Sequence, residues 1–150
     1  MKMKFGLALF FLVGVIQSAS AQFESPVAWT YSAKTQGKGN AILQMRAKIK
    51  PGWHVFSQHV KAGGPSPTSF HFDASKDFIL QGEMSEPKPI TVYEKLFKMD
   101  ISYFEKEVVF QQSLRKNVAS TVVKGKLEYM ACSAKECLPP EEVEFTIPVK

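Results

Sequence analysis

Two cysteines, Cys132 and Cys137, are the residues of this 150-residue chain best suited to covalent chemistry. They lie in the run YMACSAKECLPP, with four residues between them and two prolines close behind. If one strand enters at Cys132 and another leaves at Cys137, the four residues close a hairpin and the cysteines face each other. Their Cα atoms then come within the range of about 4.4 to 6.8 Å that a disulfide requires. The spacing therefore predicts a bond between these two residues.

Such a disulfide can be a structural staple or a redox couple. In the chain-entropy model, closing a loop of about six residues contributes roughly 2 kcal/mol, against about 4.7 kcal/mol for a loop of 100 residues. A pair at a hairpin tip is thus a weak staple, yet the thiolate of another protein can reach it. We therefore favour a redox couple, and the alternative is a secreted β-sandwich binding or adaptor module whose disulfide merely closes the hairpin.

A metal site is the third alternative, because histidines could join the two thiolates. The chain has three of them, His54, His59 and His71, and no two have the close spacing of a zinc signature. The four-residue gap between the cysteines also lies at the edge of the usual range for zinc. We therefore expect no metal and no other bound cofactor.

The first 21 residues have the pattern of a secretory signal peptide. Lys2 and Lys4 precede an apolar run over residues 5–16, and the small residues 18–21 follow it. The run is shorter than the roughly 20 residues that span a bilayer as a helix. We expect cleavage after residue 21, a single domain over residues 22–150, and an oxidising compartment that suits a paired cysteine.

The charge of the chain argues against a nucleic-acid partner. The formal net charge is +5, and without the two lysines of the signal segment it falls to +3, with 17 basic and 14 acidic residues. These charges are interspersed and form no basic stripe of the kind that binds nucleic acid. Near the cysteines, Lys135 is offset by Glu136, Glu141 and Glu142, so no electropositive pocket that would favour a thiolate is expected.

The remaining sequence is typical of an all-β protein. Short stretches rich in Val, Ile, Phe, Tyr and Thr, many of them alternating with polar residues, are cut by Gly and Pro. The stretches cover residues 41–49, 53–57, 69–73, 78–80, 101–114, 127–131 and 143–149. Seven to nine short strands predict an immunoglobulin-like two-sheet β-sandwich, with a closed barrel as the alternative. Aromatic residues expected in the core are Trp29, Trp53, Phe70, Phe72 and Phe110.

The run YMACSAKECLPPEEVEF resembles the active-site hairpin of the amino-terminal periplasmic domain of the disulfide reductase DsbD. The likeness extends to GWHVFS (residues 52–57) and to VYEKLFKMDISYF (residues 92–104), and it covers most of the mature chain. Only the Cys-turn-Pro-Pro element is specific by itself. The resemblance implies an immunoglobulin-like fold and a periplasmic monomer that acts as one component of a protein-disulfide reductase.

The resemblance also implies protein partners. Reducing equivalents would come from a membrane thiol transporter or a thioredoxin-like donor. They would pass to a disulfide isomerase or a cytochrome c maturation protein. This sequence has four residues between its cysteines where the best-known members have five, and it lacks their membrane and thioredoxin-like domains, so we expect a separate protein to donate the electrons.

Residue roles follow from the same resemblance. Cys137 would form mixed disulfides with partners, and Cys132 would resolve them. His54 and Phe56 resemble aromatic positions that line the family's site, and Phe97 would place its ring over the cysteines. The remaining residues that match the family's cap loop are Tyr93, Glu94 and Leu96.

Overall fold

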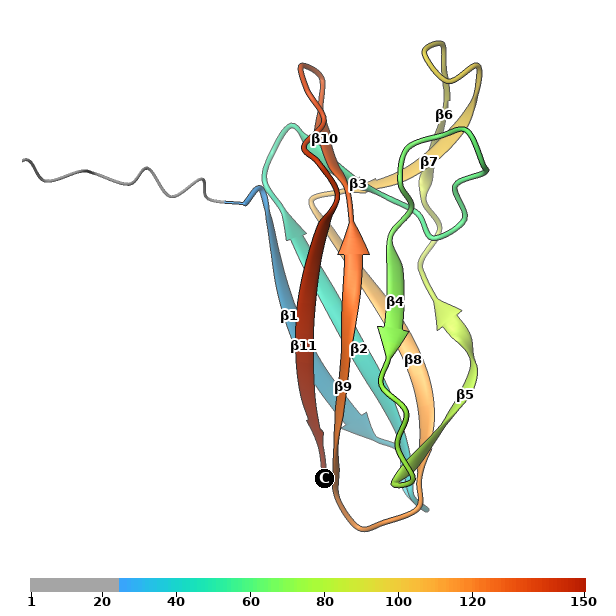
Figure 1. Ribbon diagram of the computed structural model, residues 1–150, viewed down its shortest axis with the longest axis vertical. Coiled ribbons are helices and arrows are strands. Elements are labelled where there is room, and N and C mark those ends of the chain that lie inside the picture. Colours follow the sequence, from blue (N-terminus) through green and yellow to red (C-terminus); the bar gives the residue numbers. More distant parts are fainter. Residues whose placement is uncertain (1–24) are drawn as a thin grey trace, which may run out of the picture.

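This computed structural model describes residues 25–150, which contain eleven β-strands joined by loops and no helix (Figure 1). No helix able to span a membrane occurs in that part. The predicted signal segment, residues 1–21, lies outside the described residues. The strands are β1 (Val27–Thr35), β2 (Asn40–Ile49), β3 (Trp53–Phe56), β4 (Ser69–Phe72), β5 (Phe78–Ser85), β6 (Ile90–Glu94), β7 (Met99–Glu105), β8 (Glu107–Lys116), β9 (Thr121–Tyr129), β10 (Ala131–Ser133) and β11 (Glu141–Val149).

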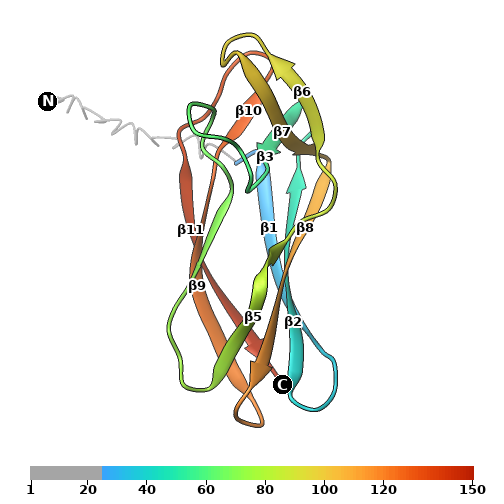
Figure 2. The same cartoon turned by 90° about the vertical axis from the view of Figure 1, so that its right-hand side faces the viewer.

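Two antiparallel sheets face each other along the length of the molecule. One has the strand order β1-β2-β8-β5 and the other the order β11-β9-β4 (Figures 1 and 2). Each sheet keeps its own edge strands, so the alternative of a closed barrel is wrong. The predicted immunoglobulin-like two-sheet β-sandwich is confirmed.

The core between these sheets is formed by every second residue of each strand, as the period of two requires. In β2 the alternating residues 41, 43, 45, 47 and 49 are all buried, and Phe110 of β8 is fully buried against the rings of Phe70 and Phe104. Four of the five aromatic residues predicted for the core are only partly buried and pack against its margin, namely Trp29, Trp53, Phe70 and Phe72.

A third sheet, with the order β10-β3-β7-β6, lies at one end of the sandwich (Figure 1). It arises partly because the predicted single strand over residues 101–114 is two strands. Strand β7 ends at Glu105 and β8 begins at Glu107, with Lys106 between them at a φ of 64°. This left-handed residue turns the chain from the third sheet into the sandwich, and the Ile49 amide donates to its carbonyl oxygen at 2.8 Å.

The strand that carries the first cysteine also changes sheet. The sequence predicts one strand over residues 127–131, but β9 ends at Tyr129, opposite Glu141 of β11, and β10 begins at Ala131, opposite Val55 of β3. The two prolines before Glu141 have no amide hydrogen to continue the β9–β11 ladder. The chain therefore leaves the sandwich and carries Cys132 into the third sheet.

Candidate functional site

Cys132 and Cys137 form a disulfide at the tip of the β10 hairpin. The sulfur atoms are 1.99 Å apart, and the two residues make an isolated antiparallel bridge. Their Cα atoms are 4.0 Å apart, slightly nearer than the range of about 4.4 to 6.8 Å expected from the sequence. The predicted bond between these residues is confirmed.

Local hydrogen bonds hold the turn between the cysteines. The Ser133 amide donates to the Glu136 carbonyl oxygen at 2.7 Å, and the Leu138 amide donates to the Ala131 carbonyl oxygen at 2.9 Å. The Ser133 hydroxyl oxygen accepts from the amides of Lys135 and Glu136, each at 3.2 Å. Because these backbone groups are bonded within the turn, the hairpin can protrude without support from the sandwich.

The two cysteines differ in burial. Cys132 is only 2% exposed and belongs to a small apolar cluster with Phe56 and Ile101, separate from the main core. Cys137, across the bridge, is exposed. Of the two residues, Cys137 is therefore the more accessible to a thiolate arriving from solvent.

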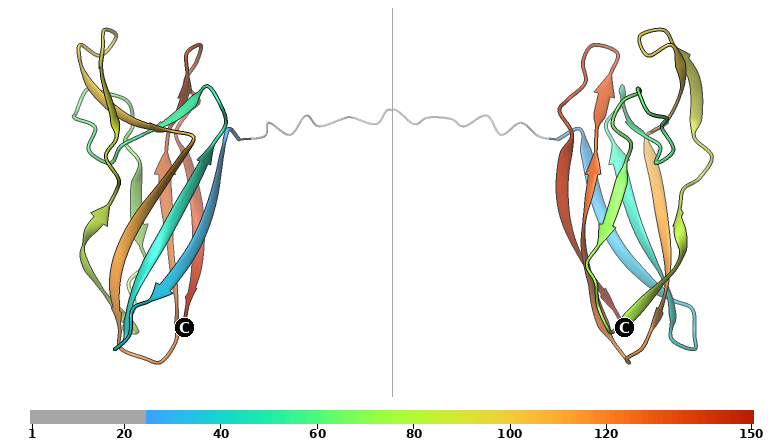
Figure 3. Two further views of the ribbon diagram at one scale, coloured as in Figure 1. Left: turned by 180° about the vertical axis from the view of Figure 1, so that it is seen from behind. Right: turned by 45° about the vertical axis from the view of Figure 1, so that its right-hand side comes forward.

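The β6–β7 hairpin faces the cysteine hairpin at the same end of the molecule (Figures 1 and 3). Its turn, residues 95–98, closes through Lys98 at a φ of 53°, and the Glu94 carboxylate accepts the Leu96 amide at 3.3 Å. The Phe97 side chain is partly buried against the Cys132 cluster, whereas Leu96 is 80% and Tyr93 63% exposed. Of the cap residues predicted from the sequence, Phe97 is the one that packs toward the disulfide.

An open depression of about 470 Å³ lies between the two hairpins and contains the disulfide. It brings together seven of the predicted site residues, namely His54, Phe56, Glu94, Leu96, Phe97, Cys132 and Cys137. Tyr93 is not among the residues that line it, because neighbouring residues of β6 point to opposite sides and Val92 and Glu94 face the depression.

His54 lies on the floor of this depression among aromatic rings. Its imidazole centroid is 4.7 Å from the ring of Tyr103 and 5.3 Å from that of Phe56. Burial lowers the pKa of His54, and the Glu105 carboxylate opposes this by raising it. The burial effect is the larger, so the imidazole is held toward its neutral form.

Comparison with known proteins bears directly on this site. The family model described as "Thiol:disulfide interchange protein DsbD, N-terminal" matches residues 20–148. The chain belongs to this family. No curated protein matches the chain.

Solved structures of DsbD N-terminal domains and a related protein share the fold. The N-terminal domain of Neisseria meningitidis DsbD in the reduced form is 21% identical, with a TM-score of 0.51, over 70% of this chain and 74% of that one. The complex between the DsbD and PilB N-terminal domains of the same organism gives 15% identity, a TM-score of 0.54 and 80% coverage of each chain. The N-terminal periplasmic domain of Proteus mirabilis ScsB gives 21% identity and a TM-score of 0.53, over 82% of this chain but only 44% of that one.

Some residues of the site in this DsbD-family chain were not predicted individually from the sequence. Ile101 and Tyr103 of β7 line the depression together with the turn residues Ser133 and Lys135. A signal for the first two existed, because they alternate within the segment that resembles the family's cap. Their approach to the cysteines depends on the pairing of β3 with β7, which alternation alone does not reveal.

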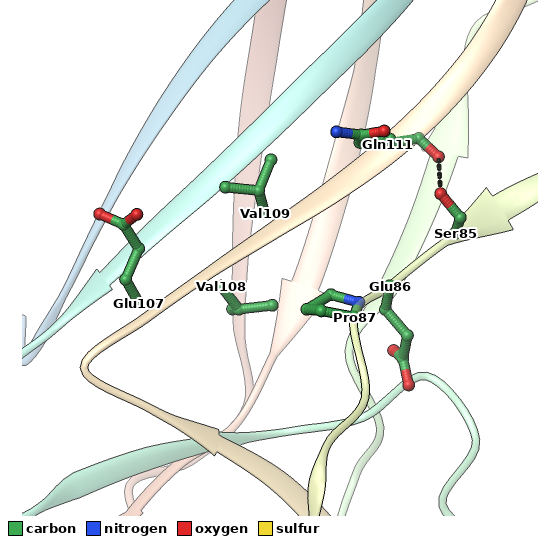
Figure 4. A pocket seen from close by; sticks show the side chains of 7 residues that line it. All are labelled: Ser85, Glu86, Pro87, Glu107, Val108, Val109 and Gln111. Carbon is green, nitrogen blue, oxygen red and sulfur yellow. Dashed lines mark hydrogen bonds between the residues drawn. The ribbon is translucent and has the colours of Figure 1, made fainter.

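A second depression, of about 440 Å³, lies on the outside of the β5–β8 edge (Figure 4). There the Ser85 hydroxyl donates to the Gln111 carbonyl oxygen at 3.3 Å. Its two carboxylates are bonded within the fold, since Glu86 accepts from Ser57 and the Gln58 amide and Glu107 pairs with Arg46. Residues 25–150 contain no group of three or more His, Cys, Asp or Glu side chains arranged to hold a metal ion. The disulfide depression is therefore the best candidate for the functional site of this family member.

Proposed function

We propose that this protein is a periplasmic thiol-disulfide interchange domain, the component of a protein-disulfide reductase that relays reducing equivalents between thioredoxin-like proteins. The observation that carries the proposal is the asymmetry of the disulfide. An exposed Cys137 is bonded to a buried Cys132, and Phe97 packs against the apolar cluster that contains Cys132. A disulfide that served only as a staple would need neither an accessible sulfur nor an aromatic cover. Membership of the DsbD N-terminal family supports the same reading.

The proposed chemistry is a two-electron exchange that needs no cofactor. A donor thiolate attacks the sulfur of Cys137, the Cys137–Cys132 bond breaks, and Cys132 leaves as a thiolate. A second donor thiol then displaces Cys137 from the mixed disulfide, so that the donor is oxidised and the domain becomes a dithiol. The reduced domain passes the electrons on by the reverse sequence, in which Cys137 attacks an acceptor disulfide and Cys132 resolves the mixed disulfide.

The location and partners complete the proposal. Removal of residues 1–21 would leave a periplasmic monomer of residues 22–150. A membrane thiol transporter or a thioredoxin-like protein would reduce it, and a disulfide isomerase or cytochrome c maturation protein would oxidise it. The structure of a DsbD N-terminal domain in complex with the PilB N-terminal domain supports a protein partner of this kind.

Mixed-disulfide trapping tests the proposal. A thioredoxin-like protein that keeps only its attacking cysteine, activated as a mixed disulfide with thionitrobenzoate, is incubated with Cys132→Ser and with Cys137→Ser. We expect a covalent complex on non-reducing gels with Cys132→Ser, because the exposed Cys137 remains and no resolving thiol competes. Cys137→Ser should trap far less, because Cys132 is covered.

The opposite pattern of trapping would invert the two roles. The reduction potential of the wild-type pair then separates a relay from a staple. A relay is reduced by thioredoxin-like proteins, whereas structural disulfides of secreted proteins have potentials below about −300 mV. A potential in that lower range would establish the alternative, a binding module with a structural disulfide.

A further inference from the structure

His54 and Cys132 are direct neighbours across two strands of the third sheet. The pairing of β3 with β10 places His54 opposite Cys132. Directly opposed residues of antiparallel strands project from the same face, with Cβ atoms about 4.5 to 5.5 Å apart. Both side chains line the disulfide depression, as this register requires. The imidazole is therefore the basic group that the sheet itself places beside the buried sulfur.

Buried Cys132 has a chemical difficulty in the proposed relay. To resolve a mixed disulfide on Cys137 it must act as a thiolate, because the thiol is not the nucleophile. Removal from water disfavours the charged thiolate, and Cys132 is only 2% exposed. A neighbouring base that accepts the thiol proton would lower the free-energy cost of forming the Cys132 thiolate.

The surroundings of His54 suit it to accept a proton. Burial lowers its pKa more than the Glu105 carboxylate raises it, so the imidazole is held toward the neutral form, which can accept a proton. That carboxylate lies opposite His54 in the β3–β7 register and can stabilise the imidazolium once it forms. The titratable groups that face His54 from the packed elements are Tyr103 and Glu105 of β7, Glu94 of β6, and Lys135 and Glu136 of the cysteine hairpin.

We propose that His54 is the general base that takes the proton from Cys132 when a mixed disulfide on Cys137 is resolved. The inference rests on the proposed function, since it assigns a role within the same exchange. The proton passes from the Cys132 thiol to a ring nitrogen of His54, and the thiolate attacks the sulfur of Cys137. The Cys132–Cys137 bond forms, the bond from Cys137 to the partner breaks, and the partner leaves as a thiolate with the electron pair. The imidazolium then releases its proton to solvent or to that thiolate.

The reverse step uses the same group. A donor thiol first gives its proton to neutral His54, directly or through solvent, and its thiolate then attacks Cys137. Cys132 leaves as a thiolate and takes that proton from the imidazolium. This prevents the buried thiolate from attacking the new mixed disulfide at once. His54 thereby favours forward passage of electrons from the donor.

The reaction of the reduced protein with excess DTNB isolates this step. Attack by Cys137 releases the first thionitrobenzoate in a phase that depends on DTNB concentration. Attack by Cys132 on the resulting mixed disulfide releases the second in a first-order phase that does not. At pH 7 we expect His54→Phe and His54→Gln to slow the second phase by about 100-fold, the lower end of a general base contribution, and to leave the first within about twofold.

The pH profile distinguishes a base from a structural residue. The difference in second-phase rate between wild type and the His54 variants should become smaller at alkaline pH, where the Cys132 thiol ionises without a base. It should also become smaller at acid pH, where His54 is protonated and cannot accept a proton. His54→Phe keeps an aromatic ring against Phe56 and Tyr103, and melting temperatures check that both variants fold. His71→Gln, at an exposed position on β4, is the matched control and should behave as wild type.

Two outcomes would overturn the inference: a second phase at the wild-type rate in both folded variants, or one slowed by the same factor at every pH. Because DTNB requires no protein partner, this result is independent of the relay itself. Failure to exchange with thioredoxin-like proteins would contradict the proposed function. The effect of His54 on the second phase of the DTNB reaction could still be measured.

Discussion

At the scale of single residues, the surroundings of the two sulfurs differ more than their positions in the sequence suggest. Cys132 packs in an apolar cluster under partly buried Phe97, while Cys137 is exposed at the hairpin tip. An attacking thiolate must approach a sulfur along a free path, so access decides which cysteine meets a partner. A cover that excludes small molecules and yields to a protein would protect the dithiol in an oxidising compartment.

We predict that Phe97→Ala speeds the reaction of the reduced protein with a small alkylating agent severalfold. The ring that packs on the Cys132 cluster is removed, so the sulfurs become more accessible to solvent. The free energy of unfolding should fall by less than about 1.5 kcal/mol, because Phe97 lies outside the main core and a core Phe→Ala costs about 3 to 5 kcal/mol. Alkylation kinetics and urea unfolding measure the two effects.

Leu96→Ala is the matched control for this experiment, since Leu96 lies in the same turn but is 80% exposed. It should leave the alkylation rate close to that of wild type. An unchanged rate in Phe97→Ala, or a loss of stability typical of a core residue, would show that Phe97 is a packing residue and no cover.

Tyr129 bonds the two flanks of the cysteine hairpin to each other. Its hydroxyl donates to the Glu141 carboxylate at 2.7 Å and lies 3.0 Å from the Ser25 hydroxyl. Burial, as the largest cause, raises the pKa of Tyr129 to about 12. Since this is above the ordinary value of about 10, neutral Tyr129 stabilises the fold below pH 10, and that contribution is lost as the pH rises toward 12.

We therefore predict that the stability advantage of wild type over Tyr129→Phe shrinks between pH 10 and 12. Below pH 10 the variant should be less stable by about 1.5 to 3 kcal/mol, the usual contribution of a hydrogen bond to a charged group. Urea unfolding at a series of pH values measures the difference. A difference that stays constant through this range would mean that Tyr129 ionises at its ordinary pH.

At the scale of elements, the β6–β7 hairpin is anchored at its base by Glu86. This residue, labelled in Figure 4, lies in the connection between β5 and β6. Its carboxylate accepts hydrogen bonds from the Ser57 hydroxyl and from the Gln58 backbone amide, the latter at 2.9 Å. Ser57 follows β3 directly, and its amide donates to the Ser102 carbonyl oxygen of β7 at 2.9 Å. The Glu86 carboxylate thus links the start of the β6–β7 hairpin to the end of β3, the strand that carries His54.

Glu86→Gln should reduce the free energy of unfolding by about 1 to 3 kcal/mol. Three donors, the Ser57 hydroxyl and the backbone and side-chain amides of Gln58, lose a charged acceptor, and the new side-chain NH2 group faces one of them. Hydrogen exchange should become faster over residues 57–68 and 90–105 and stay unchanged in β2 and β8. Glu83→Gln, at an exposed position on β5, is the control and should have little effect. Uniform acceleration across the sandwich would contradict a local anchor.

In the molecule as a whole, the end that carries the disulfide and the sandwich have separate apolar clusters. The main core lies between the two large sheets, and the cluster around Phe56, Ile101 and Cys132 lies in the third sheet. Opening the disulfide should therefore leave the main core unchanged, as the proposed relay requires.

We predict that the dithiol form stays folded and is less stable than the disulfide form by about 2 kcal/mol, because the bond closes a loop of only about six residues. For a domain of this size that difference lowers Tm by about 8 °C. Thermal unfolding with and without reductant measures it. Loss of the fold on reduction would show that the disulfide is a structural requirement and would count against a relay.

Features that depend on neighbours along the chain can be predicted from the amino-acid sequence alone. Alternation in β2 and β8 predicts their buried faces, and the four-residue gap between Cys132 and Cys137 predicts their bond, because strand period and hairpin closure are local. The resemblance carried by the cysteine hairpin, GWHVFS and the cap segment predicted the family, which the family model confirms.

Which strand lies beside which is seen only in the folded chain. The division of residues 101–114 at Lys106 and the change of sheet after Tyr129 create the third sheet, and both depend on pairing between segments far apart in the sequence. That pairing sets His54 opposite Cys132 and turns Tyr93 away from the disulfide depression. Burial of one sulfur and exposure of the other arise from the same contacts. Hydrophobic pattern fixes which face of a strand is buried, but the register between strands, which places one side chain beside another, is set by the folded chain as a whole.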